Sequence, residues 1–177
     1  MVSILGVKID DVAKSSALER VSDFLSDGKQ HSIFTPNPEM LVAAHRDPYL
    51  REILNQGSLN ICDGRGLEMM IKIKKNLNKL KRITGIDFML DICSLAEKEN
   101  KSVYLLGSDD QGVIGSAAKK LCEQFPKLTI AGFNRGPHIY AGSNARPVTP
   151  FIVDEREHNS IINDIKTTSP NILFVGF

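Results

Sequence analysis

The sequence predicts a single α/β domain over residues 1–177, with a Rossmann-like, mostly parallel sheet and helices on both of its faces. Short apolar runs alternate with longer segments in which apolar residues recur every three or four positions, a pattern typical of βαβ units. Residues 102–106 are almost wholly apolar, as expected for a central strand covered on both faces. With 177 residues and 42% hydrophobic content, the chain is about one domain long.

The first half of the chain predicts strands and helices in alternation. Residues 4–9 alternate loosely, which predicts one short edge strand. Asn37-Pro38-Glu39 predicts a helix start, because Asn can cap free amides, Pro tolerates the first helical position and Glu suits the positive end of the helix dipole. The predicted helices are 12–25, 37–45, 48–55 and 67–75, and the other predicted strands are 32–34 and 59–62.

The second half predicts a βαβ unit. Thr84 is a candidate cap for a helix over 85–100, with Ile86, Leu90, Cys93 and Ala96 on one face. A strand at 102–106, a glycine turn and a helix that carries Val113 to Phe125 lead to a strand at 128–133. A loop over 134–150, a helix over 153–166 and a final strand at 171–175 follow. Because an apolar central strand without a covering helix is an odd terminus, we expect the native protein to continue.

The bulk composition excludes several classes of protein. The net charge of +1 shows no overall excess of basic residues of the kind that nucleic-acid-binding proteins carry, so any site for a polyanion must be local. The cysteines at 62, 93 and 122 are widely spaced, which favours free thiols over disulfides or a zinc site. The N-terminus is not a signal peptide, and no apolar run approaches the roughly 20 residues that cross a bilayer. We therefore expect a cytosolic protein.

Polar residues follow two predicted strands at the point where each strand ends. Thr35 and Asn37 follow strand 32–34, and Asp63 follows strand 59–62. The carboxyl ends of strands in an open α/β sheet form the crevice in which ligands bind. Asp63 could therefore act as a general base, with Thr35 and Asn37 binding substrate hydroxyls or a phosphate. The alternatives are a turn or N-cap role for Asp63 and plain helix capping by Asn37.

Glycine turns supply further candidates for substrate binding. Gly107-Ser108-Asp109 resembles a nucleotide-binding turn, because glycine permits close backbone approach and the next helix can point free amides at phosphate. Gly64 relaxes the turn after Asp63. The sequence holds neither Gly-x-Gly-x-x-Gly nor a Walker-type lysine motif, which argues against dinucleotide dehydrogenases and P-loop enzymes.

A basic segment with an apolar edge spans residues 72–82 and contains six Lys or Arg residues. It could hold a pyrophosphate or contact anionic lipid headgroups, where each basic residue contributes roughly 1 kcal/mol. The alternative is a solvated helix end. Arg82 is the best candidate for a ligand contact, since it lies beside an apolar residue and a candidate cap. No Asp-x-Asp is present to hold a metal-bound nucleoside diphosphate.

Five motifs together resemble the WecG/TagA/CpsF glycosyltransferases. The first three of these motifs are the more specific ones. The match is poor over about 136–153, and Cys62 stands where the family has a proline before the aspartate. The motifs are residues 35–40 (TPNPEM), 63–66 (DGRG), 82–87 (RITGID), 105–108 (LLGS) and 172–176 (ILFVG).

This resemblance implies transfer of N-acetylmannosamine, or a related sugar, from its UDP donor to an undecaprenyl-diphosphate-linked N-acetylglucosamine. The expected place is the cytoplasmic membrane face, in teichoic acid or surface polysaccharide synthesis. By the resemblance Asp63 is the base, Thr35 and Asn37 line the sugar pocket, and Arg82 meets the diphosphate, with no metal or other cofactor in an inverting displacement. It also implies a C-terminal membrane-proximal segment that this chain lacks. The oligomeric state stays open, a homo-oligomer included.

Two other functions stay open from the sequence. One is a non-catalytic nucleotide-binding module of Rossmann type, in which Asp63 is only a turn residue. The other is a membrane-surface adaptor that works through residues 72–82.

Overall fold

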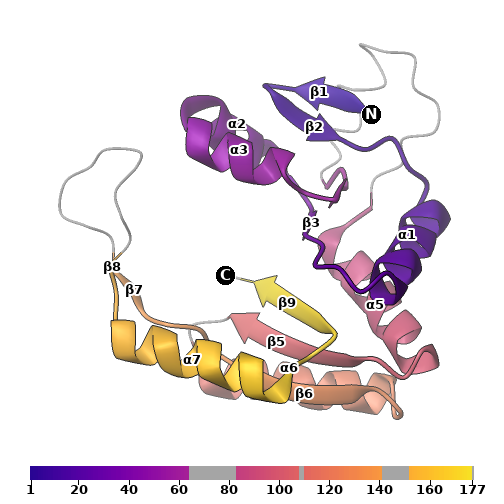
Figure 1. The fold of residues 1–177 in the computed structure, drawn as a ribbon, viewed down its shortest axis with the longest axis vertical. Helices are drawn as coiled ribbons and strands as arrows, with labels where there is room; N and C mark the ends of the chain where they lie inside the picture. The colour runs from indigo at the N-terminus through magenta and orange to yellow at the C-terminus, as the bar shows by residue number, and fades with distance from the viewer. Residues whose placement is uncertain (64–82, 108–109, 141–151, 177) are drawn as a thin grey trace. The chain divides into compact units, whose positions relative to one another are not determined.

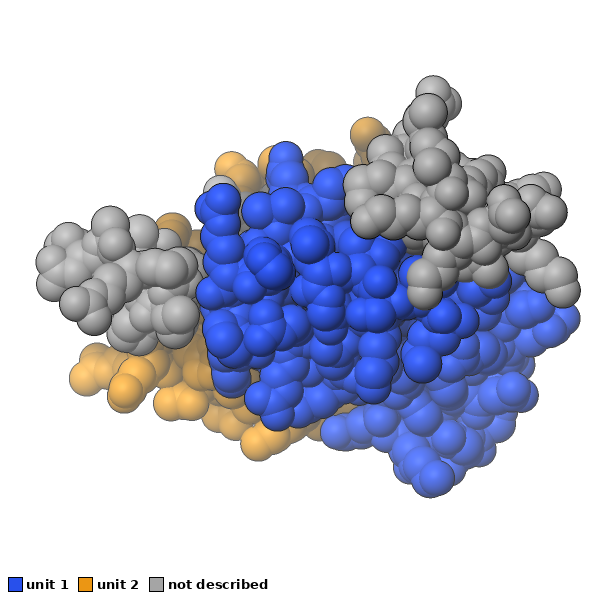
Figure 2. Space-filling model, turned by 90° about the horizontal axis from the view of Figure 1, so that it is seen from above, with its two compact units in different colours: residues 1–91 blue, residues 92–177 orange. Residues whose placement is uncertain are grey.

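The computed structural model describes residues 1–63, 83–107, 110–140 and 152–176. The chain divides into two compact units, Met1–Asp91 and Ile92–Phe177, which Figure 2 colours separately. Helices and strands alternate along the chain, and strands pair in parallel in both units (Figure 1). The predicted α/β class with parallel strand pairing is therefore confirmed. A single domain over 1–177 stays a prediction.

The first unit begins with a β-hairpin. Strands β1 (Val2–Ile4) and β2 (Val7–Ile9) pair antiparallel, so the prediction of one strand over 4–9 was wrong. The chain reverses at Leu5 and Gly6, whose φ angles are 51° and 87°. Two consecutive positive φ angles are typical of the tight turns that match the twist of a hairpin. Leucine rarely adopts this conformation, so a turn at Leu5 was not predicted.

Three helices of the first unit follow the predicted segments. Helix α1 (Lys14–Ser26) starts two residues later than predicted and ends before Gly28, whose φ of 70° closes it. Helices α2 (Pro38–Arg46) and α3 (Pro48–Asn55) both begin at a proline. Asn37 and Asp47 are their N-caps and accept hydrogen bonds from amides of the first turn. The predicted helix starts at Asn37-Pro38 and Pro48 are confirmed.

Strands β3 (Ile33–Phe34) and β4 (Leu59–Asn60) are parallel neighbours, with Ile33 opposite Leu59 and Phe34 opposite Asn60. Helices α2 and α3 form the connection between them. Because the two strands run the same way, their carboxyl ends lie at one edge. The segments that begin at Thr35 and at Ile61 therefore leave the sheet together.

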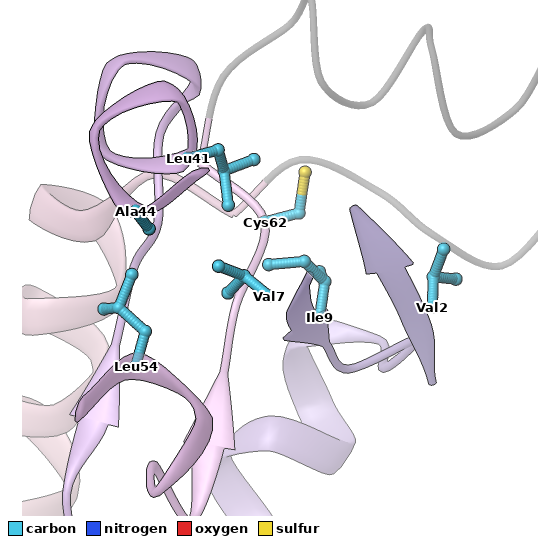
Figure 3. Close-up of a cluster of buried hydrophobic side chains, with 7 residues drawn as sticks. All are labelled: Val2, Val7, Ile9, Leu41, Ala44, Leu54 and Cys62. Carbon is cyan, nitrogen blue, oxygen red and sulfur yellow. The ribbon is translucent and has the colours of Figure 1, made fainter. Parts of the chain in front are cut away.

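Seven buried side chains form an apolar cluster in the first unit, and Figure 3 shows that they come from the hairpin, α2, α3 and the segment after β4. Cys62 is buried among them as a free thiol, where it packs as a small apolar side chain. Cys93 and Cys122 are also free, which confirms the predicted absence of disulfides at the three cysteines. The residues of this cluster are Val2, Val7, Ile9, Leu41, Ala44, Leu54 and Cys62.

Asn60 is the one buried polar side chain in the described residues, at 2% exposure. Its Nδ2 donates to the carbonyl oxygens of Lys8 at 2.9 Å and Leu54 at 2.7 Å. Its backbone N–H donates to Asp10 Oδ2 at 2.9 Å, and its carbonyl accepts from the Asp10 N–H at 2.8 Å. One side chain thus ties β2, α3 and β4 together, and it fixes the strand that leads to Asp63.

In the second unit, strands β5 (Ser102–Gly107), β6 (Thr129–Asn134) and β9 (Ile172–Gly176) form a parallel sheet in the order β6-β5-β9. Helices α6 (Gln111–Gln124) and α7 (Glu155–Thr168) both contact β6, and Figure 1 shows α7 in front of the sheet and α6 behind it. The predicted βαβ unit and the central position of β5 are confirmed.

Two expectations for the second unit were wrong. The described part of the predicted loop over 134–150 contains β7 (Ile139–Tyr140), which pairs antiparallel with β8 (Ile152–Val153). Two-residue strands have too few positions for a period to show, so the glycines and prolines dominated the pattern. The final strand was expected to be central, but among the described strands β9 has a neighbour on one side only.

The predicted face of helix α5 (Gly85–Lys98) was partly wrong. Cys93 and Ala96 are buried as expected, but Ile86 is 64% exposed. Phe88 and Ile92 are buried instead, which shifts the apolar stripe. Phe88, Ile92 and Ala96 have the i, i+4, i+8 spacing of one helical face, so this alternative stripe was present in the sequence.

Tyr104 on β5 has a fully buried side chain, and its hydroxyl donates to Asp164 Oδ2 of α7 at 2.5 Å. Burial and the nearby Asp164 carboxylate raise the pKa of Tyr104 above its ordinary value. Folding therefore favours the neutral phenol over the phenolate. The stability that this preference contributes is lost as the pH rises above about 10, where the unfolded chain begins to release the proton.

We expect Tyr104→Phe to lower the free energy of unfolding by about 1 kcal/mol at pH 7, because one hydrogen bond is lost and Asp164 can be solvated. The variant should also lose less stability than the parent as the pH rises from about 7 to about 11. Urea unfolding of both proteins between pH 7 and pH 11 measures both effects. Identical pH profiles for Tyr104→Phe and the parent would show that the phenol does not supply this dependence.

Candidate active site at the β3–β4 edge

The two segments that leave β3 and β4 run side by side. The Ile61 N–H donates to the Phe34 carbonyl at 2.9 Å, and the Asp63 N–H donates to the Pro36 carbonyl at 3.3 Å. These backbone bonds continue the parallel pairing past the ends of both strands. They place Thr35 and Asp63 on adjacent segments, as the sequence predicted for polar residues at two strand ends.

Asp63 is partly exposed, and its carboxylate reaches beyond its own turn. Its Oδ2 accepts from the Gly85 N–H at 3.1 Å, 22 residues further along the chain. Gly85 is the first residue of α5, so the carboxylate lies at the positive end of that helix. This contact was not predicted from the sequence, although the Thr-Gly pair at a predicted helix start indicated that an amide would be exposed there.

Thr35 also lies beside Gly85. A Cβ built on that glycine would be 3.1 Å from Thr35 Oγ1 and 3.7 Å from Asp63 Oδ2. A hydroxyl and a carboxylate therefore border the same small space beside the start of α5. This pairing of a hydrogen-bonding group and a potential base at one point is what a proton-transfer site requires.

Asn37 serves α2 directly. Its Oδ1 accepts from the Met40 N–H at 2.8 Å, which confirms the capping alternative for this side chain. A sugar contact by the same residue would have to come from its Nδ2. Glu39 lies in the first turn of α2, where it suits the helix dipole.

Helix α5 has a cap of its own. The Thr84 Oγ1 accepts from the Asp87 N–H at 3.2 Å and donates to the Asp87 carboxylate, so the predicted cap at Thr84 is confirmed. The Ile83 N–H donates to the Cys62 carbonyl at 3.2 Å. These contacts fix the start of α5 against the segment that carries Asp63.

The Gly107 turn differs from what the sequence predicted. Gly107 has a φ of 128°, and a Cβ there would collide with the Gly176 backbone of β9, so strand packing alone requires glycine. The Asp110 Oδ1 accepts from the N–H groups of Gly112 at 2.5 Å and Val113 at 3.3 Å. Two amides that were expected to be free for phosphate are thus bound by a carboxylate. Substrate binding by Gly107 stays a prediction.

Several predicted residues lie outside the described part of the chain. These include the substrate-binding candidates Gly64, Arg82 and Ser108. The basic segment 72–82, the predicted helix 67–75 and most of the predicted loop 134–150 also lie there.

A family model covers residues 2–177, and its description is "Glycosyl transferase WecG/TagA/CpsF family". The chain belongs to the WecG/TagA/CpsF glycosyltransferase family. The resemblance drawn from five short motifs is therefore confirmed. The family match also covers the region around 136–153, where the motifs were poor.

Curated relatives of this WecG/TagA/CpsF chain include proteins of two Staphylococcus aureus strains, NCTC 8325 / PS 47 and MRSA252. Both are named N-acetylglucosaminyldiphosphoundecaprenol N-acetyl-beta-D-mannosaminyltransferase. They are 26% identical to this chain, over 179 and 180 residues respectively. The matches cover 99% of this chain and 62% of each relative, so the chain spans about three fifths of their length.

Two features of this WecG/TagA/CpsF chain, its groups of metal-ligating side chains and its helix lengths, can be stated for the described residues. Within them, no three His, Cys, Asp or Glu residues are grouped so that they could hold a metal ion. Helices in the same part of the chain are too short or too polar to cross a membrane.

Proposed function

We propose that the protein containing this chain transfers N-acetylmannosamine, or a related sugar, from a UDP-sugar to undecaprenyl-diphosphate-linked N-acetylglucosamine. Membership of the WecG/TagA/CpsF family and the printed names of the S. aureus relatives support the reaction and its acceptor. The observation that carries the chemistry is the convergence of Thr35 and Asp63 beside Gly85. The proposed setting is the cytoplasmic face of the membrane, in teichoic acid or surface polysaccharide synthesis.

The proposed reaction is a single inverting displacement. The Asp63 carboxylate takes the proton from the acceptor hydroxyl, and the hydroxyl oxygen forms a bond to the anomeric carbon of the donor sugar. The bond from that carbon to the UDP oxygen breaks, and UDP leaves with the electron pair. One base on the acceptor side is sufficient for this step, and the Asp63 carboxylate beside Thr35 can be that base.

Thr35 has the stronger support of the two proposed sugar contacts. Its hydroxyl borders the space beside Asp63, whereas the Oδ1 of Asn37 is engaged in capping α2. Arg82 is the proposed partner of the donor diphosphate, with Gly64, Gly107 and Ser108 as further substrate contacts. We propose that amides and cations of the protein meet the leaving-group charge without a metal, since the sequence lacks Asp-x-Asp.

Calorimetry of nucleotide binding tests the donor class. We expect this chain to bind UDP in the presence of EDTA, with an affinity that added Mg²⁺ changes by less than about three-fold, because no divalent ion bridges the phosphates in the proposed site. NAD and ATP are the controls, and they should bind more weakly than UDP. A preference for NAD or ATP would instead favour a non-catalytic nucleotide-binding module, and a strict requirement for Mg²⁺ would contradict metal-independent binding.

A further inference from the structure

The two residues before Gly85 are fixed by contacts within the protein. Thr84 before it caps α5, and Ile83 is bound to the Cys62 carbonyl. The Gly85 N–H therefore has a set position at the helix start, and it donates to Asp63 Oδ2 at 3.1 Å. An amide held in this way fixes the direction of the carboxylate to which it binds.

The backbone conformation does not require glycine at this position. Glycines with positive φ in the described residues are Gly6, Gly28, Gly107 and Gly136, and Gly85 is not among them. It is a helical residue, and alanine is the better helix former. The presence of glycine here therefore needs another explanation than local conformation.

The surrounding atoms supply that explanation. A methyl group at Gly85 would enter the space between Thr35 and Asp63, 3.1 Å from Thr35 Oγ1 and 3.7 Å from Asp63 Oδ2. The Thr35 Cβ would be 3.6 Å away, so that side of the space is also closed. Both polar groups are partly exposed, so a ligand can approach them. The missing side chain therefore lets the Thr35 hydroxyl and the Asp63 carboxylate lie close together against the start of α5.

We propose that Gly85 is a positioning and specificity-determining residue of this site. Its N–H orients the Asp63 carboxylate, and its lack of a side chain lets the Thr35 hydroxyl lie close to that carboxylate, so that both groups can contact the acceptor sugar hydroxyl. This inference rests on the proposed glycosyl transfer. It assigns the acceptor, and not the nucleotide of the donor, to the space beside the first turn of α5.

Gly85→Ala tests this assignment in the full-length natural protein. We expect transfer to fall about 100-fold, because a displacement of roughly 1 Å at the reacting groups has this effect. The loss should appear in kcat and in the KM for the acceptor, while the dissociation constant for UDP stays within about two-fold. The thermal unfolding temperature should stay within a few degrees of that of the parent, because the helical preference of alanine offsets the tight contact of its methyl group with Thr35.

Two further variants make the test specific. Ile86→Ala changes the next residue of α5, whose side chain is exposed, and should leave transfer and stability unchanged. Thr35→Ser in the Gly85→Ala background should recover part of the lost transfer, because removing the threonine methyl group lets the hydroxyl move away from the added methyl. A purely structural role for Gly85 would show neither this recovery nor the selective effect on the acceptor.

The outcomes separate this inference from the proposed function. If Asp63→Asn abolishes transfer while Gly85→Ala stays within two-fold of the parent, the role of Gly85 is wrong and the base assignment stands. If Asp63→Asn retains transfer, the base assignment fails and the role of Gly85 fails with it. A lower unfolding temperature for Gly85→Ala, matched by an equal loss of UDP binding, would show that this glycine serves the fold.

Discussion

Asp63→Asn will lower sugar transfer by about 10³-fold, within the range that a general base contributes. Asparagine has nearly the same shape, and its Oδ1 can still accept from the Gly85 N–H, so the start of α5 should stay in place. What the variant loses is the ability to take a proton from the acceptor hydroxyl. The measurement is the rate of transfer from UDP-N-acetylmannosamine in the full-length protein, together with UDP affinity, which should change by less than about two-fold.

Asp47→Asn is the matched control for this substitution. Asp47 caps α3 by accepting from the amides of Tyr49 and Leu50, and asparagine is an equally good N-cap. The control variant should therefore keep both its stability and its transfer rate. Transfer by Asp63→Asn within a few-fold of the parent would exclude Asp63 as the base.

Asn60→Leu is the substitution with the largest expected effect on stability, a loss of about 3–5 kcal/mol in the free energy of unfolding. The leucine has a similar volume but no donor, so the buried Leu54 carbonyl and the part-buried Lys8 carbonyl both lose a partner. Gly57 packs directly against the Asn60 side chain, so the site has little room to adjust to a branched group. Urea unfolding gives the change in free energy.

Asn55→Ala provides the comparison. Asn55 also binds the hairpin backbone, donating to the Gly6 carbonyl at 2.9 Å and accepting from the Lys8 N–H at 2.8 Å, but both contacts are exposed to water. Its loss should cost only about 1 kcal/mol, because solvent replaces the lost partners. Equal losses for the two variants would mean that burial of Asn60 is not what makes its contacts important.

Local signals were sufficient to predict much of the fold. Asn37-Pro38 predicts a helix start because both residues act through contacts within a few positions, and the structure has the expected cap bond from Met40. Residues 102–106 predict a central strand because their side chains have no polar face, and β5 has a parallel neighbour on each side. Features of this kind depend on short segments of sequence alone.

Other features depend on partners far away in the sequence. The Leu5-Gly6 turn needs a positive φ at a leucine, and the pairing of β1 with β2 stabilises that conformation. Nothing near Gly107 in the sequence shows that the backbone of β9 lies against it. The hydrogen bonds from two amides to Asp110, which compete with a phosphate for the same groups, appear only in the folded helix. At the candidate site, the convergence of two strand ends followed from the parallel sheet, but the contact between Asp63 and Gly85 spans 22 residues and needed the structure.

A crystal structure of the full-length protein with UDP-N-acetylmannosamine tests the central claim most directly. The anomeric carbon of the donor should face the edge where β3 and β4 end, beside the Thr35 hydroxyl and the Asp63 carboxylate. A donor sugar bound at another edge of the protein, with the Asp63 carboxylate turned away from its anomeric carbon, would contradict the proposed active site at the β3–β4 edge.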